Sequence, residues 1–145
     1  MTPHEYLAKH RGELVTAATD AMKRTVHRES KTVEKAQLSH LVGVCNAATC
    51  AEEIELYLRY QAARDVWPMD AVADLIERFA GVVPAATEQH LRVAAWRLYA
   101  VYLARAFTYE KAVKDAGPPI GNRTPAPKQP GSDPRGQTDS RGGRR

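Results

Sequence analysis

The sequence has little of what most catalytic and metal sites require. It contains only two cysteines, Cys45 and Cys50, and they are not spaced as a CxxC pair. Its five histidines are scattered and form no HExxH pattern of the kind that binds zinc. Its glycines lie at junctions between apolar segments and near the C-terminus, so no glycine-rich phosphate loop exists, and no serine stands in a GxSxG setting. These absences predict a protein that is not an enzyme and that uses no metal or cofactor.

Two weaker patterns have some likeness to catalytic ones. Some small helical ribonucleases pair an arginine with a histidine four to six residues further on, but Arg24 and His27 are separated by only two residues. Glu52, Glu53 and Glu55 form a carboxylate cluster, yet their place in the first turn of an expected helix suits the helix dipole, and Glu55 is spaced to pair with Arg59. Neither pattern therefore indicates catalysis.

Long apolar runs are missing too. No stretch approaches the roughly 20 uninterrupted apolar residues that a membrane-spanning helix needs. The first residues are rich in charged and histidine side chains, which is unlike a signal peptide. We therefore expect a cytoplasmic protein with reduced thiols and no membrane partner.

Net charge is concentrated at one end of the chain. Residues 1–115 hold 15 basic and 15 acidic residues, whereas residues 116–145 hold six basic and two acidic ones, which gives the chain its net charge of +4. Residues 117–145 are rich in proline, glycine and arginine and poor in apolar residues, so we expect a disordered basic tail.

Apolar residues recur at intervals of three and four through the rest of the chain, which is the helical period. The pattern predicts helices over residues 3–27, 32–48, 49–65, 68–81 and 87–115, with Gly81 ending the fourth. No segment has the alternation of a strand. We therefore predict an all-α domain over residues 1–116: a compact bundle of about five helices, of which the last is long.

Two of the expected helices have more than one apolar face. The helix at 49–65 opens with Thr49 and Glu52, which are spaced as a capping box, and residues 87–115 form the longest helix. A surface helix needs only one apolar face, so we expect the second faces to be central in the bundle or to meet a partner subunit. The predicted subunit-interface residues are Leu56, Tyr60, Trp96, Leu103 and Phe107.

The same two helices carry arginines together with aromatic and amide side chains. Arginine binds phosphate through two parallel hydrogen bonds, and such contacts hold a nucleic acid without reading its sequence. The alternative is that these arginines pair with acidic residues inside the bundle. The candidate RNA-binding residues on these helices are Arg59, Gln61, Arg64, Arg92, Arg97 and Arg105.

Three segments resemble the all-helical small subunit of type III CRISPR effector complexes. Residues 34–38 (EKAQL) are similar to that family's Gln-Leu helix start, and residues 59–64 (RYQAAR) to its Tyr-Gln-x-Gly-Arg signature, with Ala63 in place of the glycine. Residues 91–109 resemble its last helix, which carries an arginine and aromatic series. The match covers residues 31–111 and adds Lys35 and Gln37 to the candidate RNA-binding residues.

The resemblance implies a non-catalytic subunit, present in several copies, that contacts guide and target RNA. Its other partners would be the backbone and large subunits of the complex and further copies of itself. A second hypothesis from a different class also explains the two-faced helices: a helical protein–protein adaptor or regulator with no nucleic-acid role, in which the arginines are structural.

Overall fold

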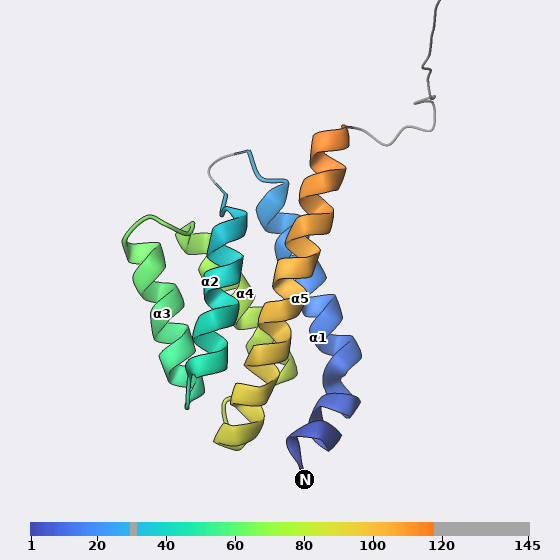
Figure 1. Cartoon of the computed structure of the whole chain (residues 1–145), viewed down its shortest axis with the longest axis vertical. Helices are drawn as coiled ribbons and strands as arrows, with labels where there is room; N and C mark the ends of the chain where they lie inside the picture. The colour runs from blue at the N-terminus through green and yellow to red at the C-terminus, as the bar shows by residue number, and fades with distance from the viewer. Residues whose placement is uncertain (30–31, 118–145) are drawn as a thin grey trace, which may run out of the picture. The chain divides into compact units, whose positions relative to one another are not determined.

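The computed structural model describes residues 1–29 and 32–117, and every regular element among them is an α-helix. The helices are α1 (Pro3–Val26), α2 (Lys35–Ala47), α3 (Ala51–Ala63), α4 (Met69–Val82) and α5 (Gln89–Ala116) (Figure 1). The prediction of an all-α bundle of five helices with a long last helix is confirmed. Most of the predicted tail, residues 118–145, lies outside the described residues.

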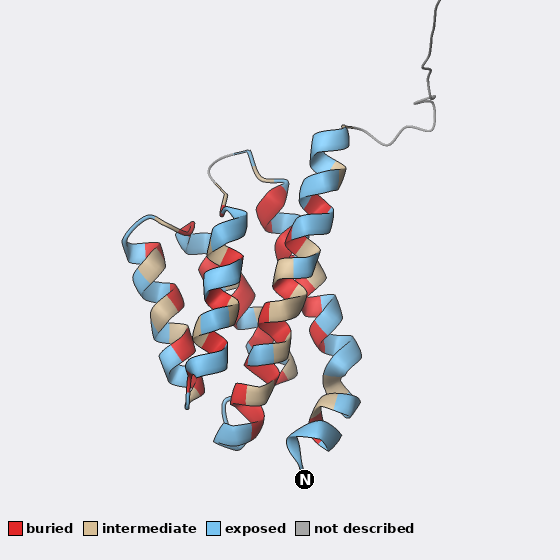
Figure 2. Ribbon diagram, in the orientation of Figure 1, coloured by how far each residue is buried: buried red, intermediate tan, exposed pale blue. Residues whose placement is uncertain are grey.

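The long helix α5 is the central helix of the bundle. Buried residues occur along most of its length (Figure 2). Its side chains make a hydrogen bond to each other helix or to the residue that ends it: Glu110 with His27, Arg97 with Cys45, Arg92 with Glu52, and Tyr99 with Leu75. Most apolar residues of α5 are therefore covered by this chain's own helices, although Tyr109 remains exposed.

This arrangement corrects three predicted interface residues. Trp96, Leu103 and Phe107 are buried in the core and present no surface to a partner. Trp96 stacks on Phe79 of α4 with ring centroids 4.2 Å apart, and Tyr99 lies 5.3 Å from the same ring. These residues belong to the core because α5 has neighbours on both sides. The sequence shows two apolar faces on this helix, but it does not show whether this chain or a partner covers the second one.

Two helix ends differ from the expected ones. Thr49 and Glu52 do not form a capping box: the N-cap of α3 is Cys50, and the backbone N–H of Ala51 donates to Gln89 Oε1 at 2.7 Å. A long-range side chain thus replaces the local cap. Gly81 does not end α4 either, since the helix continues through Val82.

Helix α3 lies at the edge of the bundle beside α2 and α4 (Figure 1). Its C-terminal end is a Schellman motif, in which the N–H of Asp65 donates to Ala62 O and the N–H of Val66 to Gln61 O. Asp65 has a φ of 64°, the left-handed conformation that glycine adopts most easily. Because α3 has few neighbours, it is the helix whose second face remains exposed.

Candidate binding surfaces on α2, α3 and α4

Arg92 is a structural residue and not part of an exposed groove. Its side chain is only 8% exposed, and it donates to Glu52 at 2.9 Å and lies 3.6 Å from Glu55. The hydrogen bond from Arg92 lowers the pKa of the Glu52 carboxyl below its ordinary value. The pair joins α5 to α3, so the prediction that Arg92 contacts RNA is wrong and the alternative of pairing inside the bundle holds for it.

Arg97 is occupied in a similar way by backbone carbonyls. Its guanidinium donates to Cys45 O at 3.0 Å and to Ala48 O at 3.3 Å, at the end of α2. Carbonyls at a helix C-terminus lack hydrogen-bond partners within the helix, and Arg97 supplies them. Its positive charge also interacts favourably with the negative end of the helix dipole. It therefore caps α2 and is poorly placed to release these contacts for a phosphate.

Arg105 lies apart from the other candidates. It is exposed on α5 and lines a shallow groove against α1 with Val15, Thr19 and Tyr109. Arg105 therefore does not share a surface with the candidates on α2 and α3.

Four of the predicted RNA-binding residues lie at one end of the bundle. Helices α2 and α3 are antiparallel neighbours, so α2 begins where α3 ends (Figure 1). We call this region the α2–α3 end. It holds Lys35, Gln37, Gln61 and Arg64.

The cations of the α2–α3 end are accessible. Lys35 and Arg64 are exposed, and Arg64 donates to Gln61 Oε1 at 3.3 Å while its guanidinium lies 5.5 Å from the centre of the Tyr60 ring. The first turn of α2 has no acidic residue, and its N-cap, Glu34, makes no side-chain capping bond. This end therefore carries two exposed cations and a helix N-terminus, which suit anionic groups. Exposed Glu34 and Asp65 stand next to the two cations, and Lys35 lines a pocket with Lys111 of α5.

Arg59 lies on the opposite side of α3 from Arg64. Five residues turn a helix by about 140° from its starting direction, and Arg59 faces α4, where it lines a groove of about 580 Å³. Its nearest acidic partner, Glu55, is 3.8 Å away. The structure therefore separates the two arginines of the RYQAAR segment onto different surfaces.

The groove between α3 and α4 is apolar. Its α4 wall is a row of residues spaced four, three and four apart, next to the core stripe of the same helix. The sequence pattern does not single out this row as a surface, because its two alanines add little hydrophobicity, although its spacing is that of a helix-packing seam. The row consists of Met69, Ala73, Ile76 and Ala80.

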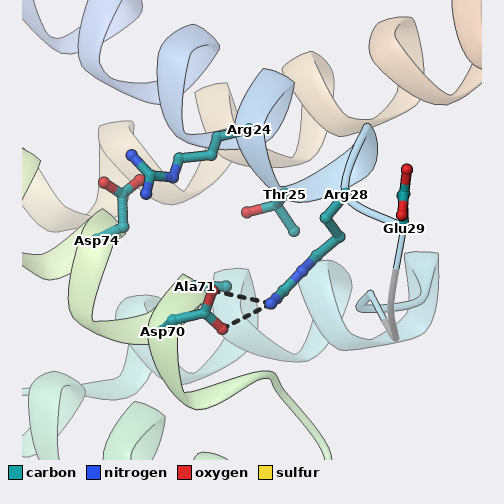
Figure 3. Close-up of a pocket in the computed structure, with 7 residues that line it drawn as sticks. All are labelled: Arg24, Thr25, Arg28, Glu29, Asp70, Ala71 and Asp74. Atoms are coloured by element: carbon teal, nitrogen blue, oxygen red, sulfur yellow. Dashed lines mark hydrogen bonds and ion pairs between the residues drawn. The ribbon is translucent and has the colours of Figure 1, made fainter.

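A second pocket, between α1 and α4, is polar. Arg28 donates two hydrogen bonds of 2.8 Å to Asp70 (Figure 3), and these bonds lower the pKa of the Asp70 carboxyl. Deeper along α4, Asp74 accepts from Arg78 at 2.9 Å. With Arg24 and Glu29 also lining it, the pocket has nearly balanced charge. The Arg28–Asp70 pair joins α4 to the residues that follow α1, and the lining leaves little net charge to attract a ligand.

Two features of the described residues concern metal and thiol chemistry. Among them, no group of three or more histidine, cysteine, aspartate or glutamate side chains is placed to hold a metal ion. Cys45 is buried, and burial raises the pKa of its thiol to about 12, so it is not a ready nucleophile. Within residues 1–29 and 32–117, no helix has the length and hydropathy needed to cross a membrane.

Comparison with known proteins leaves the resemblance without independent support. No family model matches the chain, and neither curated proteins nor solved structures give a significant match.

Proposed function

We propose that this chain is a non-catalytic small subunit of a type III CRISPR RNA-guided effector complex, as its resembling segments imply. In that role it contacts the backbone of guide or target RNA in the cytoplasm, beside the backbone and large subunits. The observation that carries the RNA contact is the α2–α3 end, where Lys35 at the start of α2 and Arg64 at the end of α3 are both exposed and Arg64 is bonded to Gln61. Cleavage of RNA would belong to other subunits.

The chemistry of this surface favours backbone contact over sequence recognition. The Arg64 guanidinium presents a planar set of donors that matches two phosphate oxygens, and Lys35 adds a point charge. Gln37 and Gln61 offer both donors and acceptors, which suits ribose hydroxyls and phosphates. Such contacts position a nucleic acid but carry little sequence information.

Salt-dependent RNA binding tests the proposal. We expect the double variant Lys35→Ala/Arg64→Ala of the full chain to bind single-stranded RNA more weakly, whatever the RNA sequence. The slope of log affinity against log salt should flatten by about 0.7 for each phosphate that the variant no longer binds. Fluorescence anisotropy with two unrelated RNA sequences measures both effects.

The matched control is Lys9→Ala/Arg11→Ala. It removes the same number and kinds of charge from an exposed part of α1, away from the α2–α3 end. Both double variants keep the basic C-terminal segment, so non-specific RNA binding by that segment contributes equally to the two. Equal losses of affinity in the two double variants would show that net charge, and not this surface, holds the RNA.

The protein–protein adaptor remains the second candidate function, and a specific observation favours it. Arg92 and Arg97 are both held by contacts within the bundle, while the groove between α3 and α4 is open and apolar. The adaptor hypothesis expects no loss of RNA binding in the Lys35→Ala/Arg64→Ala variant. Genomic context separates the two hypotheses: CRISPR repeats and effector-subunit genes beside this gene support the first, and their absence supports the second.

A further inference from the structure

The groove between α3 and α4 leaves an apolar surface open to solvent. Met69 at one end of it is 65% exposed, and Ala73 and Ala80 further along α4 are exposed as well. The opposite wall is formed by Ala62 and Arg59 of α3, and the space between the walls is about 580 Å³. We call this site the α3–α4 groove. An open apolar groove of this size between two helices is typical of a binding site.

The α4 wall has the spacing of a helix-packing seam. From Met69 to Ala80 its residues recur at intervals of four, three and four, which are those of the a and d positions of a heptad. The wall runs for about 17 Å, or about three helical turns. Ala73 and Ala80 are small, so larger side chains of an incoming helix can pack over them.

An extended peptide suits the α3–α4 groove poorly. Its backbone N–H and C=O groups need hydrogen-bond partners once they are buried, and an extended chain obtains them from the edge of a sheet. Both walls of the groove are helices, whose own backbone groups are paired within α3 and α4. A bound α-helix pairs its own backbone groups and needs only an apolar stripe to fill the groove.

The two rims of the groove carry opposite charges. Arg59 stands on the α3 rim with a side chain that is 60% exposed, and its ion partner Glu55 is 3.8 Å away. Glu77 stands exposed on the α4 rim and has no ion-pair partner among residues 1–29 and 32–117. Two other acids of α4, Asp70 and Asp74, are already bonded to arginines. A helix in the groove is therefore favoured when its flank towards α4 is basic and its flank towards α3 is acidic.

We propose that the α3–α4 groove binds an amphipathic helix of another protein, about three turns long, with a stripe of large aliphatic residues between one basic and one acidic flank. The opposite rim charges favour this partner over a lipid chain, which would leave both charges without a counterpart. The proposal specifies the partner that the adaptor hypothesis leaves open. It does not rest on RNA binding, since no residue of the α2–α3 end lines the groove.

Binding of designed helical peptides to the full chain tests the groove. The mixed peptide has about 14 residues, leucines at the a and d positions, lysines along one flank and glutamates along the other, with a crosslink on its outer face to keep it helical. Fluorescence anisotropy should give a dissociation constant below about 100 µM. Ala73→Glu places a charge inside the groove and should raise this constant at least about tenfold. The matched control Ala8→Glu alters an exposed alanine of α1 and should leave it unchanged.

Reversal of the rim charges tests the flanks of the partner. The wild-type chain should bind the mixed peptide more tightly than a peptide with two lysine flanks or two glutamate flanks. Arg59→Glu makes both rims acidic, so the peptide with two lysine flanks should become the tightest by about threefold or more. Arg11→Glu changes the net charge equally at an exposed site on α1 and should keep the wild-type preference. The double variant Arg59→Glu/Glu77→Arg should again prefer the mixed peptide, which then lies in the groove in the opposite direction.

Three results would overturn the proposal. One is a mixed peptide that shows no binding at about 200 µM protein. Another is binding that Ala73→Glu leaves intact, or a peptide preference that does not follow the rim charges. The third is a wild-type chain that forms a dimer at these concentrations and loses it on Ala73→Glu, because the groove would then hold a second copy. Circular dichroism checks that every variant keeps its helical content.

Discussion

Replacement of Arg92 tests the division of the arginines into structural and exposed ones. Arg92→Ala removes a buried guanidinium and its aliphatic stem, which leaves Glu55, only 19% exposed, with Arg59 at 3.8 Å as its remaining cation. Breaking a fully buried ion pair costs about 3–5 kcal/mol. Glu52 is 61% exposed and regains water, so we expect a smaller loss of about 2–3 kcal/mol in the free energy of unfolding.

Arg92→Met is the informative companion variant. Methionine keeps most of the buried stem and removes the Nε atom, which is buried without a hydrogen-bond partner. Like alanine, methionine removes one partner of the ion pair and leaves the two carboxylates, but it keeps the packing of the stem. We therefore expect Arg92→Met to lose less stability than Arg92→Ala. Urea denaturation followed by circular dichroism measures both variants, with stability extrapolated to zero denaturant.

The pH dependence of stability supplies a second measurement. Arg92 lowers the pKa of Glu52 in the folded protein, whereas the unfolded chain has the ordinary value of about 4.3. Between the two values the unfolded chain binds more protons, so stability rises with pH. The contribution is complete above the ordinary pKa and is lost as the pH falls through the folded pKa. Arg92→Met should therefore show a shallower loss of stability in acid than the wild type.

Two outcomes would refute the structural role of Arg92. One is an Arg92→Ala protein that unfolds at wild-type urea concentrations yet binds RNA more weakly. The other is an unchanged acid profile in Arg92→Met, which would mean that Glu52 does not depend on this guanidinium.

Other positions give further predictions. Trp96→Ala should lower the free energy of unfolding by about 3–5 kcal/mol in the same urea assay, because the ring is fully buried against Phe79; a loss below 1 kcal/mol would contradict its place in the core. Asp65→Gly should raise the free energy of unfolding by about 1 kcal/mol, and with it the melting temperature, since glycine adopts the positive φ with less strain; a lower melting temperature would show that contacts of the Asp65 side chain outweigh this strain. Glu110→Ala should cost about 1–3 kcal/mol in urea, because it removes a buried carboxylate bonded to His27 at 2.9 Å. Truncation after residue 116 should leave the melting temperature nearly unchanged while weakening salt-sensitive RNA binding.

The helices could be predicted because their signal is local. Apolar residues at intervals of three and four show where a helix forms, and the observed bounds of α1 to α5 lie within a few residues of those expected. The predicted helix ends at Thr49 and Gly81 are wrong because helix ends depend on contacts with other parts of the chain. Gln89 accepts a hydrogen bond from the first residue of α3, and α4 continues past the glycine to Val82.

The surface residues could be predicted only in part. The sequence shows that α3 and α5 each have two apolar faces, but it does not show how many neighbours each helix has. Helix α5 has neighbours on both sides, so Trp96 is buried, whereas α3 lies at the edge, so Leu56 and Tyr60 are exposed. Arg92 meets Glu52 across 40 residues of chain, a pairing that no local pattern predicts.

The two arginines of α3 can be tested separately, because α3 lies at the edge of the bundle and they lie on different sides of it. Arg64 belongs to the α2–α3 end and Arg59 to the groove wall, although only four residues separate them. Arg64→Ala should weaken RNA binding, whereas Arg59→Ala should leave it unchanged. If both substitutions weakened RNA binding equally, one continuous basic strip would run around α3. The separation of the two arginines onto different surfaces would then be wrong.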